Sequence, residues 1–212
     1  MKKYFYLVLI LFLPHFVFAV ELQSDAELFH ENSPVFAKIV RAASVVKRIA
    51  SNFSQKRHLS MLKDPLVSKG HFYYEKPDKL RWEVSDPVIS GFAVNGKNGK
   101  RWKNGTFQVQ TFKISRVPFV KLFAEQVFAW TNADFKKLQE GYEILVLGEN
   151  PLTLKLVPIS AKGKEYIDDI RIQFADDARY VNKIKICEKG EDFTEISFYE
   201  TVVNGPIPKN MF

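Results

Sequence analysis

The sequence predicts a mainly β protein of the α+β class, in which a curved antiparallel sheet carries a few helices on its apolar face. Apolar and polar residues alternate through most of the chain after residue 53, as they do in half-buried strands. Two hairpin dipeptides, Asn95-Gly96 and Asn104-Gly105, separate neighbouring alternating runs. Aromatic residues make up 14% of the chain. They could fill the space between sheet and helices, and a hollow core is the open alternative.

Residues 1–19 have the pattern of a secretory signal peptide. Two lysines precede an apolar run over residues 4–18, and Ala19 ends it as a cleavage site requires. A membrane-anchoring helix is the alternative, but such a helix needs about 20 apolar residues. This run is shorter, and Pro14 interrupts it. We therefore expect cleavage before Val20.

Residues 20–212 have the length of one domain with a sizeable core. The whole chain carries a formal net charge of +7, spread in single and paired residues. This charge favours mild attraction to anionic membrane surfaces, whereas a nucleic-acid-binding protein needs longer basic clusters. The single cysteine, Cys187, cannot form an internal disulfide, which fits a bacterial periplasm better than the route of disulfide-stapled secreted domains. We expect a periplasmic monomer that binds no nucleic acid.

Helical periodicity appears in three segments. Ser33-Pro34 has the pattern of a helix start, and apolar residues then recur every three or four positions as far as Phe53, which predicts one amphipathic helix. The segment 117–130 places its apolar residues on a broad helical face. A short helix over 133–140, capped by Asn132, is expected to follow.

Alternating runs predict the strands of the sheet. Phe72, Tyr74, Leu80 and Trp82 share one parity, so they are expected to face the same side of a hairpin. Further alternating runs lie at 142–146, 152–156, 170–174, 184–186 and 196–198. Because short turns join these runs, the strands are expected to pair in antiparallel fashion.

Four stretches of the sequence carry a resemblance to a known family. They are the F-x-Q run at 53–55, the G-x-F-x-Y-x-K-P hairpin at 70–77, the N-G turn at 95–96 and the tryptophan that follows it. In this order they resemble the periplasmic outer-membrane lipoprotein carriers, the LolA-like proteins. The resemblance covers nearly all of the chain after the signal peptide. Carriers of that family continue beyond the position of Phe212, so we expect a divergent member.

The resemblance implies an unclosed antiparallel β-barrel with a helical lid over an apolar cavity. In that family the cavity receives the acyl chains of a lipoprotein, which is taken from an inner-membrane ABC transporter complex and passed to an outer-membrane receptor. A carrier of another lipid, such as a glycolipid or an aryl-polyene lipid, is one alternative. A lipid-responsive sensor with the same fold is another. We expect no cofactor and no metal ion, because the acidic pairs Asp168-Asp169 and Asp176-Asp177 fit solvated loops.

Parity and the resemblance together predict the residues of this site. The expected lining of the cavity consists of inward-facing apolar residues of the first strands, namely Phe53, Phe72, Tyr74, Leu80, Trp82, Phe92 and Val94. The expected lid presents Val120, Phe123, Val127 and Phe128.

Lys76 has the parity of Tyr74, so a regular strand would bring it to the inner side at the rim, where a charge needs partners. The LolA-like proteins commonly have an arginine at this position, and its guanidinium holds the lid by donating hydrogen bonds to backbone carbonyls. A lysine can also donate to carbonyls at a helix C-terminus, but as a point charge. Lys76 is therefore the candidate lid latch, with a solvated turn lysine as the alternative.

Catalytic motifs are missing or incomplete. Residues 91–97 match the start of a phosphate-binding loop, but Asn98 stands where serine or threonine is required, and a hairpin is expected in place of a helix. The chain has no Gly-x-Ser-x-Gly elbow and no His-Glu-x-x-His pair. The sequence therefore predicts a binding protein and not an enzyme.

Overall fold

The computed structural model describes residues 27–30, 33–103 and 109–212. The expected signal peptide over 1–19, its cleavage before Val20 and the turn at Asn104-Gly105 lie outside these residues.

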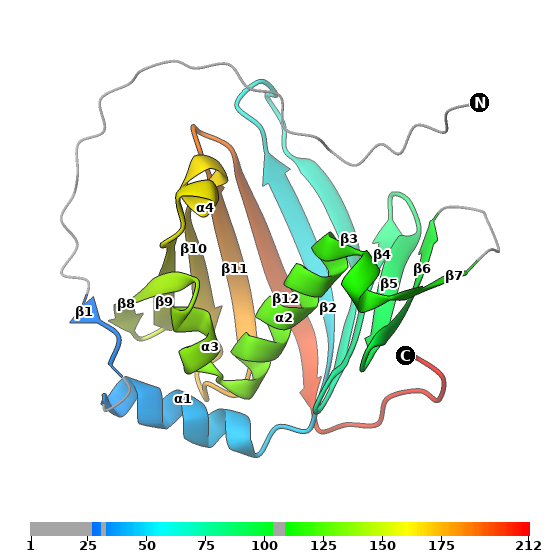
Figure 1. The fold of residues 1–212 in the computed structure, drawn as a ribbon, viewed down its shortest axis with the longest axis horizontal. Coiled ribbons are helices and arrows are strands. Elements are labelled where there is room, and N and C mark those ends of the chain that lie inside the picture. Colours follow the sequence, from blue (N-terminus) through cyan, green and yellow to red (C-terminus); the bar gives the residue numbers. More distant parts are fainter. Residues whose placement is uncertain (1–26, 31–32, 104–108) are drawn as a thin grey trace.

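Twelve strands form one antiparallel sheet in the described part of the chain (Figure 1). Their order is β1-β8-β9-β10-β11-β12-β2-β3-β4-β5-β6-β7, so the sheet ends at β1 and β7 and does not close. This confirms the predicted fold class, a mainly β protein built on an unclosed antiparallel barrel. The strands are β1 (Glu27–Leu28), β2 (Arg48–His58), β3 (Leu66–Glu75), β4 (Lys79–Asp86), β5 (Ser90–Asn95), β6 (Asn98–Lys103), β7 (Gln110–Lys113), β8 (Tyr142–Glu149), β9 (Leu152–Pro158), β10 (Ile167–Phe174), β11 (Val181–Glu188) and β12 (Phe193–Val203).

The helices lie on the concave side of the sheet and near both of its ends, with α4 near the upper end in the view of Figure 1. The longest, α2, crosses the concave face, whereas α1 lies along the lower end in the view of Figure 1. Among the described residues, no helix is both long and apolar enough to cross a membrane. The helical elements are α1 (Pro34–Ser44), η1 (Ile114–Arg116), α2 (Pro118–Asn132), α3 (Phe135–Gln139) and α4 (Ala161–Tyr166).

The helix expected to run from Pro34 to Phe53 is shorter than predicted, because α1 ends at Ser44 and β2 begins at Arg48. Its start is as predicted: the Ser33 side chain accepts a hydrogen bond from the backbone N–H of Phe36. The error arose because Ile49 and Phe53 are four residues apart, a spacing that suits both a helix and a strand. Ser51 between them is also buried, and only the two-residue period of a strand explains all three.

The segment after the first helix holds one confirmed and one corrected element. The helix predicted over 117–130 is confirmed as α2, which begins at Pro118 and ends at Asn132. The short helix that follows is α3, and its cap is Asp134, whose side chain accepts from the backbone N–H of Lys137. The prediction that Asn132 caps it was wrong. Asn132 instead closes α2 and accepts a hydrogen bond of 2.7 Å from the hydroxyl of Tyr74.

An aromatic layer fills one half of the space beneath α2. The ring of Phe53 stacks on that of Trp82, with their centroids 4.0 Å apart. The ring of Phe123, from α2, meets Trp82 and Phe92 edge-on at 5.2 and 5.5 Å. Gly70 lets β3, β4 and this layer approach closely, because a Cβ atom there would clash with the backbone carbonyl of Glu83 and lie 2.6 Å from the ring of Phe53. The first half of the sheet is therefore packed against α2.

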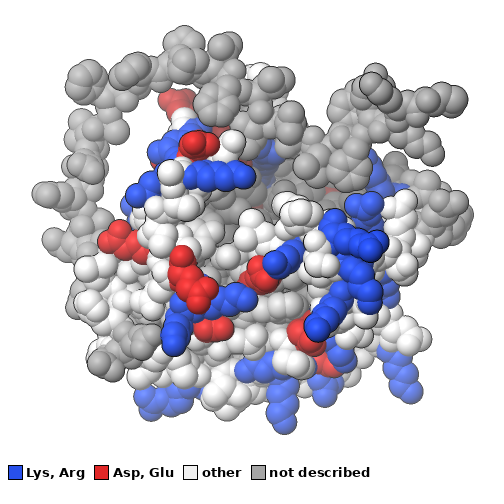
Figure 2. Space-filling model, viewed as in Figure 1, with Lys and Arg blue, Asp and Glu red and all other residues white. Residues whose placement is uncertain are grey.

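The opposite face of the sheet carries charged pairs. Arg81 and Glu83 on β4 form a salt bridge of 2.5 Å, and Lys183 on β11 lies 3.3 Å from Glu195 on β12. On the face of the molecule that carries α2, acidic side chains lie among the basic ones (Figure 2). The positive charge of the chain is thus partly neutralised by neighbours where the structure describes it.

Candidate functional site

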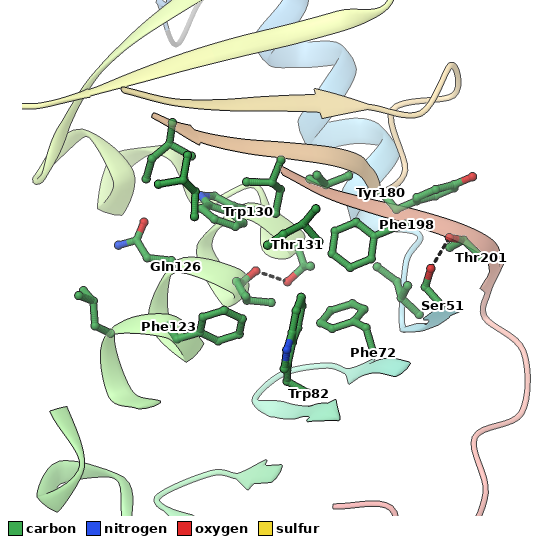
Figure 3. Close-up of a pocket in the computed structure, with 18 of the residues that line it drawn as sticks. Ser51, Phe72, Trp82, Phe123, Gln126, Trp130, Thr131, Tyr180, Phe198 and Thr201 are labelled. Atoms are coloured by element: carbon green, nitrogen blue, oxygen red, sulfur yellow. Dashed lines mark hydrogen bonds between the residues drawn. The ribbon is translucent and has the colours of Figure 1, made fainter. Parts of the chain in front are cut away.

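A cavity of about 320 Å³ lies between α2 and the second half of the sheet. Its wall on the sheet side comes mainly from β10, β11 and β12, with Ile49 and Ser51 of β2, Phe72 of β3 and Trp82 of β4 at its boundary. Its wall on the helix side is one face of α2 (Figure 3). The residues of α2 in this wall recur at three- and four-residue spacing, namely Phe119, Leu122, Phe123, Gln126, Val127, Trp130 and Thr131.

The cavity wall is almost entirely apolar, and the hydroxyls of Ser51, Thr131 and Thr201 in it are bonded within the protein. The hydroxyls of Ser51 and Thr201 lie 2.7 Å apart and form a hydrogen bond (Figure 3). The hydroxyl of Thr131 donates to the carbonyl of Val127 at 2.8 Å. Bonded in this way, these side chains offer little to a polar ligand, so the cavity suits hydrocarbon.

The structure separates the seven residues that sequence reasoning placed in the cavity wall. Phe72 and Trp82 line the cavity. The other five, Phe53, Tyr74, Leu80, Phe92 and Val94, lie in the packed half of the core. Their exposed fractions do not exceed 9%, so they are buried side chains and form no open rim.

Two of the four expected lid residues lie at the cavity and two lie elsewhere. Phe123 and Val127 face the cavity. Val120 is buried, and Phe128 lies against Tyr74 with ring centroids 6.2 Å apart. The stripe of α2 that faces β10–β12 borders this cavity, and the other side of α2, Phe128 included, borders a second cavity of about 490 Å³ next to the β5–β6 turn and η1.

Most of the observed lining escaped the sequence argument. The strands β11 and β12 contribute Ile184, Ile186, Ile196 and Phe198, which alternate as inward-facing residues should. Their alternation was visible in the sequence. Their place in the wall depends on the pairing of β12 with β2, which sets Phe198 opposite Phe53. No local pattern indicates that pairing.

Lys76 lies in the turn between β3 and β4, and its ammonium donates a hydrogen bond of 2.8 Å to the carbonyl of Ala43. Ala43 belongs to the last turn of α1. The backbone N–H of Lys76 also donates to the carbonyl of Lys47, just before β2. Burial lowers the pKa of Lys76 below its ordinary value of 10.5. The side chain thus joins the turn to the C-terminal end of a helix, where a cation is favoured.

The described residues contain no group of three or more histidine, cysteine, aspartate or glutamate side chains that could hold a metal ion. Cys187 is half-buried, and burial raises the pKa of its thiol. A protonated thiol is a poor nucleophile, so this cysteine is not activated for covalent chemistry.

Residues 44–212 match the family described as outer membrane lipoprotein carrier protein LolA. No curated protein matches the chain. Among solved structures, a DUF1329 family protein from Desulfovibrio piger is similar, with 10% identity, a TM-score of 0.43, and coverage of 82% of this chain and 93% of that one. A LolA superfamily protein from Nitrosomonas europaea has 8% identity, a TM-score of 0.41, and coverage of 85% and 98%. LprF from Mycobacterium bovis has 12% identity, a TM-score of 0.43, and coverage of 82% and 93%.

The family match extends from the last residue of α1 to the end of the chain and takes in α2 and the sheet from β2 to β12. It therefore includes every residue of the cavity wall. This chain belongs to the family of the outer membrane lipoprotein carrier protein LolA.

Proposed function

We propose that this protein is a carrier that shelters the acyl chains of a lipoprotein in the cavity beneath α2. The observation that carries the proposal is the cavity itself, about 320 Å³ of space with an apolar wall. Small-molecule pockets span about 300–1,000 Å³, so this one lies at the lower end of the range. A lipid with several chains would therefore require α2 to move outward.

The energetic need for such a carrier is large. Each buried methylene contributes about 0.8 kcal/mol, so one chain of about 16 carbons is disfavoured in water by roughly 12 kcal/mol. Aromatic and branched aliphatic walls can replace the membrane for such a chain during transfer. An enzyme that used a wall hydroxyl as its nucleophile would still need a general base beside it. The polar groups described in the wall are hydroxyls, one amide and one indole.

The proposed route leads from the inner to the outer membrane. The chain would be exported by the signal peptide at 1–19, and residues 20–212 would act as a single-domain monomer in the periplasm. Cargo would come from an ABC transporter complex in the inner membrane and pass to a receptor in the outer membrane. The family match supports this route, as does the export pattern of the sequence.

The contact of Lys76 with Ala43 is proposed to act as a latch between the sheet and the helices. It joins the β3–β4 turn to α1, and α1 in turn contacts α2. Phe36 of α1 also packs against Phe135 of α3, with ring centroids 5.5 Å apart. Loosening of α1 would therefore remove support from the helices that cover the cavity.

Native mass spectrometry of the protein after mild extraction from cells tests the function directly. We expect a bound acylated species, and a lipoprotein should be the dominant cargo. A glycolipid or an aryl-polyene lipid in its place would keep the carrier role and change the cargo. A protein that carries no lipid and does not bind a fluorescent fatty acid would refute the proposal.

A further inference from the structure

The second cavity, of about 490 Å³, lies on the side of α2 that faces away from β10–β12. Its wall comes from three separate parts of the chain: the β5–β6 turn, the stretch from the end of β7 into η1, and one side of α2. Its lining differs in kind from that of the cavity beneath α2, because several of its side chains are charged. We call it the basic cavity.

Lysines from all three parts of the wall meet at the basic cavity. Lys97 belongs to the β5–β6 turn, Lys113 ends β7, and Lys121 lies on α2. The wall contains one carboxylate, that of Glu125, which lies 4.0 Å from the ammonium of Lys121. The ammonium of Lys113 donates to the neutral amide of Asn98 at 2.7 Å. The wall therefore carries an excess of two positive charges, and a concave surface of one charge sign attracts ions of the opposite sign.

Charged groups just outside the wall leave this excess unchanged. Arg116 follows Ser115 in η1 and adds one positive charge. Asp78 adds one negative charge beside the turn, where its carboxylate would lie 3.3 Å from a Cβ atom at Gly96. On the face shown in Figure 2, basic side chains gather on the side of α2 where Figure 1 places β6 and β7.

The floor of the basic cavity is apolar. It contains Ala124, which is buried, and Ile114 and Phe128, which are half-buried. A bare inorganic ion would satisfy the lysines and leave this floor in contact with water. A long hydrocarbon chain would have to lie against three ammonium groups, and a cation would be repelled. The lining therefore suits a molecule that combines a negative charge with an apolar part.

We propose that the basic cavity binds an amphipathic anion, with a phosphate or carboxylate head among the lysines and a short apolar body on the floor. Ammonium groups form strong, charge-assisted hydrogen bonds with such a head. A head that contacts both Lys97 and Lys121 joins the β5–β6 turn to α2. The backbone N–H of Ile114 already donates to the carbonyl of Lys97 at 3.1 Å, so the turn and η1 are held together. The bound anion thus fixes α2 against this edge of the sheet.

Phenyl phosphate is the probe for this site, and calorimetric titration of the intact protein measures its affinity. We expect it to bind more tightly than inorganic phosphate, which lacks the apolar body, and benzyl alcohol, which lacks the charge. Benzylammonium has the opposite charge and should not bind. Added salt should weaken phenyl phosphate binding, because it screens exposed charges. Backbone amide signals of Gly96 and Ser115 should shift in NMR spectra, and hydrogen–deuterium exchange of α2 should slow.

Single lysine variants locate the charge effect. Lys97→Gln and Lys113→Gln should each weaken phenyl phosphate binding about fivefold, the upper end of what one exposed ion pair contributes. Lys183→Gln is the matched control, because it removes the same charge from the opposite face of the sheet, where Lys183 lies 3.3 Å from Glu195. It should leave the affinity unchanged. Thermal melts establish that each variant is folded.

Several results would overturn the site. They are equal affinity for phenyl phosphate and benzyl alcohol, an equal loss in Lys183→Gln and the two wall variants, and amide shifts at Ile184 of the cavity beneath α2 in place of Gly96. Unchanged exchange in α2 at saturating phenyl phosphate would overturn its fixation by the anion.

Vesicles distinguish two sources of the anion. Binding to phosphatidic acid vesicles, but not to phosphatidylcholine vesicles, that is lost in Lys97→Gln would assign the site to a lipid headgroup. Binding of phenyl phosphate without binding to either vesicle would assign it to a free anion. None of these measurements uses an acyl chain in the cavity beneath α2, so the site and the carrier function stand or fall separately.

Discussion

Replacement of Lys76 by methionine should loosen α1 and speed the release of a bound acyl chain. The substitution keeps the apolar stem of the side chain and removes the donor that lies 2.8 Å from the carbonyl of Ala43. A hydrogen bond from a charged group contributes about 1.5–3 kcal/mol, and a cation at a helix C-terminus about 0.3–1 kcal/mol. Lys76 is half-buried, and the fall in its pKa shows that burial opposes the charge. The net contribution is therefore about 1 kcal/mol.

A change of about 1 kcal/mol corresponds to about a fivefold shift in the opening equilibrium of the latch. Hydrogen–deuterium exchange of the α1 amides measures that opening, and stopped-flow release of a fluorescent fatty acid measures its consequence. Lys76→Arg should slow release, because the guanidinium can donate from two nitrogens. Lys79→Met is the matched control, since Lys79 lies on the same hairpin and pairs with Glu75 at 2.6 Å. Equal exchange and equal release in wild type and all three variants would refute the latch.

The pH dependence of the latch has a definite sign. We call the latch closed when the Lys76 ammonium donates to the carbonyl of Ala43, and open when Lys76 is solvated. Burial lowers the pKa of Lys76 in the closed state, so the closed state binds the proton less tightly than the open state. Closure should therefore become more favourable as pH rises through the alkaline window just below 10.5. A latch held by charge alone would weaken over the same window. Release rates measured across that window distinguish the two cases, and Lys76→Met should lose the dependence.

Three further outcomes concern the core. Leu80→Ala should lower the free energy of unfolding by about 2–5 kcal/mol, because Leu80 is fully buried, and it should have little direct effect on acyl binding, because Leu80 does not line the cavity. Ile184→Ala changes the cavity wall and should weaken acyl binding. Gly70→Ala should cost about 1–3 kcal/mol or more, because its Cβ would clash with the backbone carbonyl of Glu83 and with the ring of Phe53. Gly148→Ala, whose Cβ meets nothing closer than 3.7 Å, should cost less, and denaturant titrations compare the two. Burial raises the pKa of Tyr74, so its contribution to stability is complete below pH 10 and is lost as pH rises through the raised value; Tyr74→Phe should flatten this alkaline loss.

The sequence by itself determined the elements whose periodicity was unambiguous. Phe72 and Tyr74 were expected to share a face with Leu80 and Trp82, and in the sheet Phe72 pairs with Trp82 and Tyr74 with Leu80. The helix α2 was evident because its apolar residues follow a helical period over fifteen residues. Local sterics and side-chain periodicity decide such elements, so they can be read from a short window of sequence.

Ambiguity began where one spacing suits two structures. Ile49 and Phe53 lie four residues apart, which fits either a helix face or alternate positions of a strand, and the chain forms β2 there. The cap of α3 was misplaced for a similar reason. Asn132 and Asp134 can both cap a helix, but α2 continues through Asn132 and α3 begins at Phe135, which places Asp134 at the cap position.

The location of the cavity was decided by tertiary structure alone. It depends on β12 lying next to β2, which joins strands separated by more than a hundred residues and brings Phe198 opposite Phe53. It depends also on volume, because Phe53, Trp82 and Phe123 fill the space under one half of α2 and leave the other half open. Alternation in a strand shows which side chains face inward. Whether they meet a neighbour or an empty space depends on how the whole sheet curves around the helix.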